Sequence, residues 1–224
     1  MGLSTLEGCA ETVTHCACCA AKPLKRGWAE VAARAEKMLY EVRWHGRGGQ
    51  GVVTASDLLA RAAILESKYV YHAPEFGPER RGAPVRAYTR IADEPIEQHF
   101  GVYNPDAVVV IDPSLQSATS FILEGVKKGG LLVVNAREVH RDLLEGAKAL
   151  GLSVWSVDAF KVAMEVFGRP LYNTPMLGAF VKASGLVALE SVLKAVEERF
   201  KNPQLVARNV EAVKRCYEGV KRVV

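Results

Sequence analysis

The sequence predicts an α/β fold: a doubly wound, mostly parallel sheet with helices on both faces and a helical C-terminal region. Strand patterns alternate with helical patterns through most of the chain, which is the order that strand–helix–strand units require. The runs 107–111 (AVVVI) and 131–134 (LLVV) are continuously apolar, as in parallel strands buried on both faces. After residue 157 the pattern is helical only, so we expect those helices to pack on the same sheet.

Strands are expected where apolar and polar residues alternate, or where a short apolar run is bounded by turn residues. In chain order they are 39–45, 69–73, 85–92, 107–111, 131–134 and 153–157. The glycine-rich turn 46–51 ends the first of them, and Asp112-Pro113 ends the fourth.

Helices are expected where apolar residues recur at helical spacing. In chain order they are 52–65, 115–128, 139–150, 158–167, 174–185, 188–200 and 203–221. Glycine and proline separate them: Gly129-Gly130 ends the second helix, and Gly168, Gly185 and Asn202-Pro203 divide the last four.

The composition is that of an ordinary globular protein. The 224 residues are 49% hydrophobic and 24% charged, which supplies a core and argues against wholesale disorder. The formal net charge is +4 and no polybasic block occurs, so we expect neither nucleic acid nor a membrane surface as a partner. No apolar run approaches the roughly 20 residues of a membrane span.

The cysteines set the first 37 residues apart from the rest. Four of the five lie in that segment: Cys9, Cys16, Cys18 and Cys19. The remaining body, with Cys216 alone, is typical of a reduced, cytoplasmic protein. Three interpretations of residues 1–37 stay open: a metal site with an unusually crowded spacing, a disordered or weakly helical appendage, and a true start at Met38. We favour the last two and expect the functional domain at 38–224.

A glycine-rich turn, GRGGQG at 46–51, follows the first strand and opens the first helix. Glycines at this spacing permit a tight bend and let a phosphate approach the backbone. The free N–H groups and the positive end of the helix dipole would face that anion, and Arg47 adds a full positive charge. The alternative is a tight turn that binds nothing.

Two common nucleotide sites fit this turn poorly. A dinucleotide fold carries an acidic residue at the end of its second strand, about 20 residues past the glycines. Here that strand ends in Tyr71-His72-Ala73. A P-loop ends in Gly-Lys-Ser/Thr, whereas Val52-Val53 follows Gly51. These departures count against an NAD enzyme and against a P-loop NTPase.

Two further segments are candidates for the same site. The loop 74–84 (PEFGPERRGAP) follows the second strand, near the edge where such sheets bind ligands. Its charged residues are Glu75, Glu79, Arg80 and Arg81. We favour a ligand or subunit contact for this loop over a solvated surface role. In NTPMLG (173–178), Asn173 or Thr174 can cap a helix that either faces the ligand or simply begins a packed helix.

No residue pattern predicts catalysis by this chain alone. The histidines are scattered, no HExxH or GxSxG motif occurs, and a lone cysteine in a terminal helix is typical of a small core residue. We therefore predict no catalytic residue and no metal ligand in the body of the chain.

Three motifs in order resemble one family. HGRGGQG (45–51) with the following Val-Thr-Ala is similar to the opening of the gamma subunit of 2-oxoacid:ferredoxin oxidoreductases, of the pyruvate and 2-ketoisovalerate type. PEFGPERRG (74–82) and NTPMLGAF (173–180) are similar to that family's second and third signature segments. The likeness spans about residues 38–200. Ala83 departs from it, because a second glycine is common at that position.

The resemblance implies a role within an assembly. Such enzymes decarboxylate a 2-oxoacid on thiamine diphosphate, pass electrons through iron–sulfur clusters to ferredoxin and release acyl-CoA. The thiamine diphosphate and clusters belong to partner alpha, beta and delta subunits, and the gamma chain is associated with coenzyme A as substrate. The residues that would hold the CoA phosphates are Gly46, Arg47, Gly48, Gly49, Gln50, Gly51 and Asn173. This chain would bind no cofactor by itself.

Other functions stay open at this point. A close variant is the small subunit of indolepyruvate ferredoxin oxidoreductase, which shares this domain. A different class is a free-standing nucleotide-binding oxidoreductase, and a third is a purely structural subunit whose glycine turn binds nothing.

Overall fold

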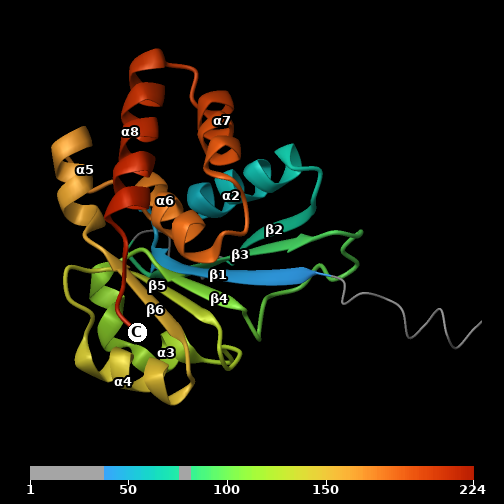
Figure 1. Cartoon of the computed structure of the whole chain (residues 1–224), viewed down its shortest axis with the longest axis vertical. Helices are drawn as coiled ribbons and strands as arrows, with labels where there is room; N and C mark the ends of the chain where they lie inside the picture. The colour runs from blue at the N-terminus through green and yellow to red at the C-terminus, as the bar shows by residue number, and fades with distance from the viewer. Residues whose placement is uncertain (1–37, 76–81) are drawn as a thin grey trace, which may run out of the picture. The chain divides into compact units, whose positions relative to one another are not determined.

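The structure is a computed structural model and describes residues 38–75 and 82–224 (Figure 1). The predictions for residues 1–37 lie outside the described residues and stay predictions. Among the described residues, no helix combines the length and the apolar character that crossing a membrane requires.

A seven-stranded sheet forms the centre of the fold, in the order β2-β3-β1-β4-β5-β6-β7. The strands are β1 (Leu39–Arg47), β2 (Tyr69–Glu75), β3 (Pro84–Ala92), β4 (Ala107–Val110), β5 (Leu131–Asn135), β6 (Ser153–Val157) and β7 (Lys221–Arg222). β1, β4, β5 and β6 are parallel neighbours, while β3 runs antiparallel to both β1 and β2, and β7 runs antiparallel to β6. β2 therefore points the same way as β1, and the sheet is mostly parallel, as the sequence predicted.

Helices cover both faces of this sheet (Figure 1). They are α2 (Val52–Leu65), α3 (Thr119–Leu123), α4 (Arg141–Ala149), α5 (Ala159–Phe167), α6 (Asn173–Ser184), α7 (Leu189–Arg199) and α8 (Pro203–Gly219). The larger core lies between the sheet and α2 with α5–α8, around Trp44, Leu58 and Phe180. The smaller core lies under α3 and α4, around Leu132 and Leu143. The doubly wound arrangement is thereby confirmed.

The prediction of one helix over 115–128 is wrong. Residues Pro113–Ser117 form a 3-10 turn, and α3 ends at Leu123. Arg43 on β1 explains why α3 ends early. Its guanidinium donates hydrogen bonds to the carbonyl oxygens of Ile122 (3.0 Å) and Glu124 (2.6 Å). Gly125 then adopts a positive φ of 66°, with the Tyr103 carbonyl oxygen 2.1 Å from where a Cβ would lie. The chain therefore turns away from the helix axis.

The strand order places a topological switch point between β1 and β4, and we call the position beyond the ends of these two strands the crevice. β1 leads into α2 on one face of the sheet, whereas β4 leads into α3 on the other face. In open α/β sheets, ligands bind beyond the carboxyl ends of strands at such a point. The glycine turn after β1 and Asp112 after β4 both lie there.

Cys216 lies on α8 in the larger core and is fully buried. Burial, followed by the negative charge of Asp158, raises the pKa of its thiol to about 12. Because only the thiolate reacts with alkylating agents, about one thiol in ten thousand is reactive at pH 8. We expect iodoacetamide at pH 8 to leave Cys216 unmodified in the folded protein and to alkylate it in urea, as read by peptide mass spectrometry. Rapid labelling of the native protein would contradict this.

Candidate functional site

The glycine turn has one buried end and one open apex. A Cβ on Gly46, which is buried, would lie 2.5 Å from the Val52 side chain, so this glycine lets β1 pack closely on the start of α2. Gly49 is exposed at the apex with φ 95° and has nothing within 4 Å of a Cβ. Only glycine adopts such a backbone freely. The bend is therefore open to solvent at its tip.

Backbone donors gather at the start of α2. The helix begins at Val52, its N-cap Gly51 offers no side-chain cap, and its first turn holds no acidic residue. The first helical hydrogen bond runs from the Ala55 amide to the Gly51 carbonyl (3.0 Å). In the described part of the chain, no acceptor is recorded for the amides of Gly49, Gly51 or the first helical turn. An anion would satisfy these donors and the helix dipole together.

Arg47 brings a positive charge to this turn. Its guanidinium donates to Ser114 Oγ (3.1 Å) and to the Gly82 carbonyl (2.9 Å), and its Nε lies 3.6 Å from Asp112 Oδ2. The side chain remains about one third exposed. It is thus held in place at the crevice and still reaches solvent.

Asp112 was not among the predicted site residues, although it is central to this crevice. It lies two residues past the end of β4 and is buried. Its carboxylate accepts hydrogen bonds from the Gln50 side-chain amide and from the Ser114 backbone amide (2.7 Å). The signal that could have found it is an aspartate directly after a strand buried on both faces.

Asn173 lies beside the turn. Its Nδ2 atom is 2.7 Å from where a Cβ on Gly51 would stand. The prediction that Asn173 or Thr174 caps a helix is wrong, because α6 begins at Asn173, its N-cap is Tyr172 and no side chain caps it. Thr174 instead donates its hydroxyl to Asn209 Oδ1 on α8 (2.7 Å). The Asn173 amide remains half-buried beside the uncapped start of α2.

Tyr172 borders the same crevice. Its ring is buried, and burial, followed by the negative charge of Asp112, raises the pKa of the phenol. The hydroxyl is therefore protonated at neutral pH and adds no negative charge near the turn.

The charged loop is described only at its ends. Glu79, Arg80 and Arg81 lie outside the described residues, so their predicted role stays a prediction. Just after them, the Gly82 amide donates to the Gly48 carbonyl (3.3 Å) and the Ala83 carbonyl accepts from the Gly48 amide (2.9 Å). The loop thus ends directly against the glycine turn.

Glu75 lies farther from the turn than the loop's end does. It pairs with Arg86 on β3, and Arg86 pairs with His45 on β1, so a strand separates Glu75 from the turn. Its carboxylate accepts a hydrogen bond from the Tyr88 hydroxyl. With Arg86 and Phe121 it lines a cavity of about 200 Å³.

His45, directly before the turn, is buried and neutral. Burial, followed by the positive charges of Arg43 and Arg86, lowers the pKa of His45 well below its usual value. Arg43 Nε donates to His45 Nε2 (3.0 Å), which assigns the ring proton to Nδ1. The ring also meets Phe121 edge-on, with centroids 5.0 Å apart. His45 thus supports the strand rather than facing the crevice.

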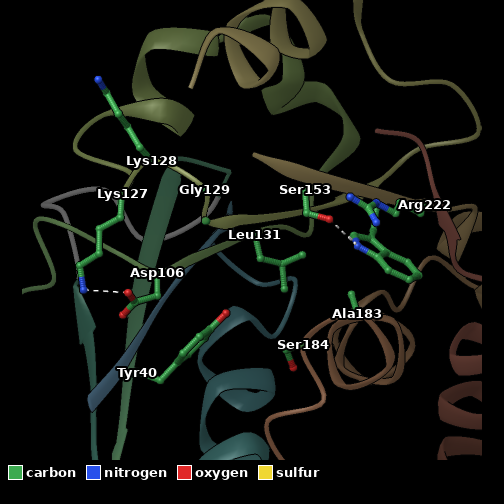
Figure 2. A pocket seen from close by; sticks show the side chains of 12 residues that line it. Tyr40, Asp106, Lys127, Lys128, Gly129, Leu131, Ser153, Ala183, Ser184 and Arg222 are labelled. Atoms are coloured by element: carbon green, nitrogen blue, oxygen red, sulfur yellow. Dashed lines mark hydrogen bonds and ion pairs between the residues drawn. The ribbon is translucent and has the colours of Figure 1, made fainter. Parts of the chain in front are cut away.

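A separate cavity of about 480 Å³ lies at the opposite edge of the sheet (Figure 2). Asp106, Leu131 and Ser153 line it at the amino ends of β4, β5 and β6. Lys127 is paired there with Asp106 (2.8 Å), and burial, followed by Asp106, raises the pKa of Tyr40 to about 12. This cavity does not contribute to the crevice between β1 and β4.

The groups around the glycine turn are suited to binding an anion. They include backbone donors, one guanidinium and two side-chain amides. Across residues 38–75 and 82–224, no three His, Cys, Asp or Glu side chains gather in a way that would hold a metal ion. The structure brings the turn and Asn173 together, and it adds Asp112 and Ser114.

Comparison with known proteins agrees with these motifs. The family model for "Pyruvate ferredoxin/flavodoxin oxidoreductase" matches residues 41–219. The chain is 46% identical over 180 residues to the pyruvate/ketoisovalerate oxidoreductases common subunit gamma of Thermococcus litoralis, covering 80% of this chain and 96% of that one. It is 45% identical over 183 residues to the NADH-dependent phenylglyoxylate dehydrogenase subunit gamma of Aromatoleum evansii, covering 81% and 94%.

A solved structure extends the likeness to three dimensions. The crystal structure of pyruvate oxidoreductase subunit PORC (EC 1.2.7.1) from Thermotoga maritima superposes with a TM-score of 0.72 at 41% identity, covering 83% of this chain and 99% of that one. The resemblance drawn from the three motifs is thereby confirmed. The chain belongs to the pyruvate ferredoxin/flavodoxin oxidoreductase family.

Proposed function

We propose that this chain is the gamma subunit of a multi-subunit 2-oxoacid:ferredoxin oxidoreductase, with pyruvate as the favoured 2-oxoacid. Its own task is to hold the phosphates of coenzyme A at the turn 46–51. The matched relatives are named as gamma or PorC subunits, which supports a place in such a complex. The chain by itself carries out no redox step.

The observation that carries the CoA role is the uncapped start of α2. Its amides have no recorded acceptor in the described part of the chain, the Gly49 apex is exposed, and Arg47 supplies a cation. Coenzyme A carries a pyrophosphate and a further phosphate, which match backbone donors at a helix N-terminus. The Asn173 amide, beside Gly51, offers an additional hydrogen bond.

The rest of the reaction belongs to the partners in this proposal. Alpha, beta and delta subunits hold the thiamine diphosphate and the iron–sulfur clusters, and ferredoxin accepts the electrons. Relatives named for pyruvate, ketoisovalerate and phenylglyoxylate are about equally identical to this chain. That supports a role separate from recognition of the acid. A cytoplasmic location fits the single free cysteine of the described residues.

The test compares Gly49→Asp with Gly49→Asn in the assembled complex. A side chain at Gly49 meets open space, and Asn and Asp tolerate its positive φ about equally. The two variants therefore differ mainly by one negative charge at the proposed phosphate site. We expect the KM for CoA to be about tenfold higher in the Asp variant than in the Asn variant, because charge repulsion in a phosphate site is expected to cost about 1.4 kcal/mol.

The measurement is steady-state ferredoxin reduction with saturating pyruvate and varied CoA. The kcat and the KM for pyruvate should stay the same in both variants. Equal KM values for CoA in the two variants would refute the CoA role, and would favour a structural subunit.

A further inference from the structure

Asp112 connects three elements at the crevice. It is buried two residues past the end of β4. It reaches Gln50 in the glycine turn, Arg47 at the end of β1 and Ser114 in the 3-10 turn. A buried carboxylate without partners would be costly, so these contacts offset the cost of its burial and fix its place.

We infer that Asp112 is a positioning residue for the CoA phosphates: it acts through Gln50 and Arg47, and does not itself touch the ligand. This inference rests on the proposed function of the turn.

The contact with Gln50 sets the shape of the bend. The Gln50 side chain donates from Nε2 to Asp112 Oδ2, and its Oε1 accepts the Arg47 backbone amide (2.9 Å). The Gln50 amide thus clamps the first residue of the turn while Asp112 fixes the orientation of that amide. Loss of the carboxylate frees Gln50 to rotate, and the bend from Arg47 to Gln50 loses a side-chain clamp.

The contacts on the other side set the direction of Arg47. Its Nε lies 3.6 Å from Asp112 Oδ2 and donates to Ser114 Oγ (3.1 Å). Ser114 is itself held by its backbone amide, which donates to Asp112 Oδ1 (2.7 Å). The Asp112 carboxylate therefore orients the Arg47 guanidinium both directly and through Ser114.

The direction in which Asp112→Asn changes the affinity for CoA distinguishes a positioning role from a simple effect of charge. A carboxylate near a phosphate repels it, so Asp112→Asn would tighten CoA binding if charge were all that mattered. As a positioning residue, Asp112 must accept a hydrogen bond on each of its two carboxylate oxygens. Asparagine places an NH₂ group against either Gln50 Nε2 or the Ser114 amide, so one hydrogen bond is lost and CoA binding weakens.

The experiment measures the KM for CoA, the KM for pyruvate and kcat in the assembled complex of Asp112→Asn, Gln50→Ala and the double variant. We expect each single variant to raise the KM for CoA about five- to tenfold, and to change the KM for CoA by more than it changes the KM for pyruvate. The double variant should resemble the single ones, since residues that act through one contact are not additive. Asp142→Asn, at a side chain 74% exposed, is the matched control and should change nothing.

Each outcome separates this inference from the proposed function. A lower or unchanged KM for CoA in Asp112→Asn, or additive effects in the double variant, overturns the positioning role. The Gly49 variants are measured in the same series. If Gly49→Asp raises the KM for CoA above that of Gly49→Asn, the proposed function stands even when the positioning role of Asp112 is overturned. If the two Gly49 variants have equal KM values for CoA, the proposed function itself is overturned. Should Asp112→Asn not assemble, Gln50→Ala breaks the same hydrogen bond from the half-buried turn, and an unchanged KM for CoA there overturns the inference.

Discussion

Replacing Gly178 by alanine is expected to lower the free energy of unfolding by about 3 kcal/mol or more. Gly178 lies on α6 where that helix meets α8, and a Cβ there would stand 2.2 Å from the Val213 carbonyl oxygen and 2.9 Å from its carbon. Both atoms are backbone, so no side-chain rotation relieves the clash. The gain of about 1 kcal/mol from alanine's better helix propensity is too small to offset it.

The measurement is urea or thermal unfolding of the purified chain, with Gly219→Ala as the matched control. Gly219 is also helical and has nothing within 4 Å of a Cβ, so its replacement should be neutral or slightly stabilising. Equal midpoints for the two variants would show that α6 and α8 do not approach as closely as described.

The same contact bears on the candidate site. Asn173 begins α6, and Gly178 lets that helix lie close against α8. A Gly178→Ala protein that still folds must move α6 relative to α8 and so shift Asn173 relative to Gly51. We therefore expect the assembled complex of that variant to show a raised KM for CoA as well as a lower Tm.

Replacing Arg90 by methionine is expected to cost about 3 kcal/mol and to loosen the segment 98–101. Arg90 is buried on β3, and its Nε donates to Glu41 Oε1 (2.8 Å). Its terminal nitrogens donate to the carbonyls of Gln98 (3.1 Å), Phe100 (2.5 Å) and Gly101 (3.1 Å). Methionine fills the volume of the stem but leaves these three carbonyls without their donor.

Hydrogen exchange around 98–101 and the unfolding midpoint measure this effect together. Arg141→Met is the control, because Arg141 is 86% exposed and its pair with Glu145 (2.8 Å) is solvated. That control should change stability by less than about 0.5 kcal/mol. If Arg90→Met behaves like the control, the guanidinium contributes nothing beyond its stem.

The sequence determined the local parts of this protein. Residue periodicity placed most strands and helices within a few positions, because each pattern reflects which side of one element is buried. The glycine spacing at 46–51 placed the turn between β1 and α2, since the bend depends on the backbone freedom of its own residues. The three motifs were sufficient to indicate the family.

The tertiary structure alone decided how these parts meet. β3 lies between β1 and β2, so the end of β2 is not next to the turn, and no local pattern encodes that order. Arg43 ends α3 from 81 positions away, and Asp112 meets Gln50 from 62 positions away. Such contacts depend on how whole elements pack around a shared core, and that packing is set by many distant side chains at once.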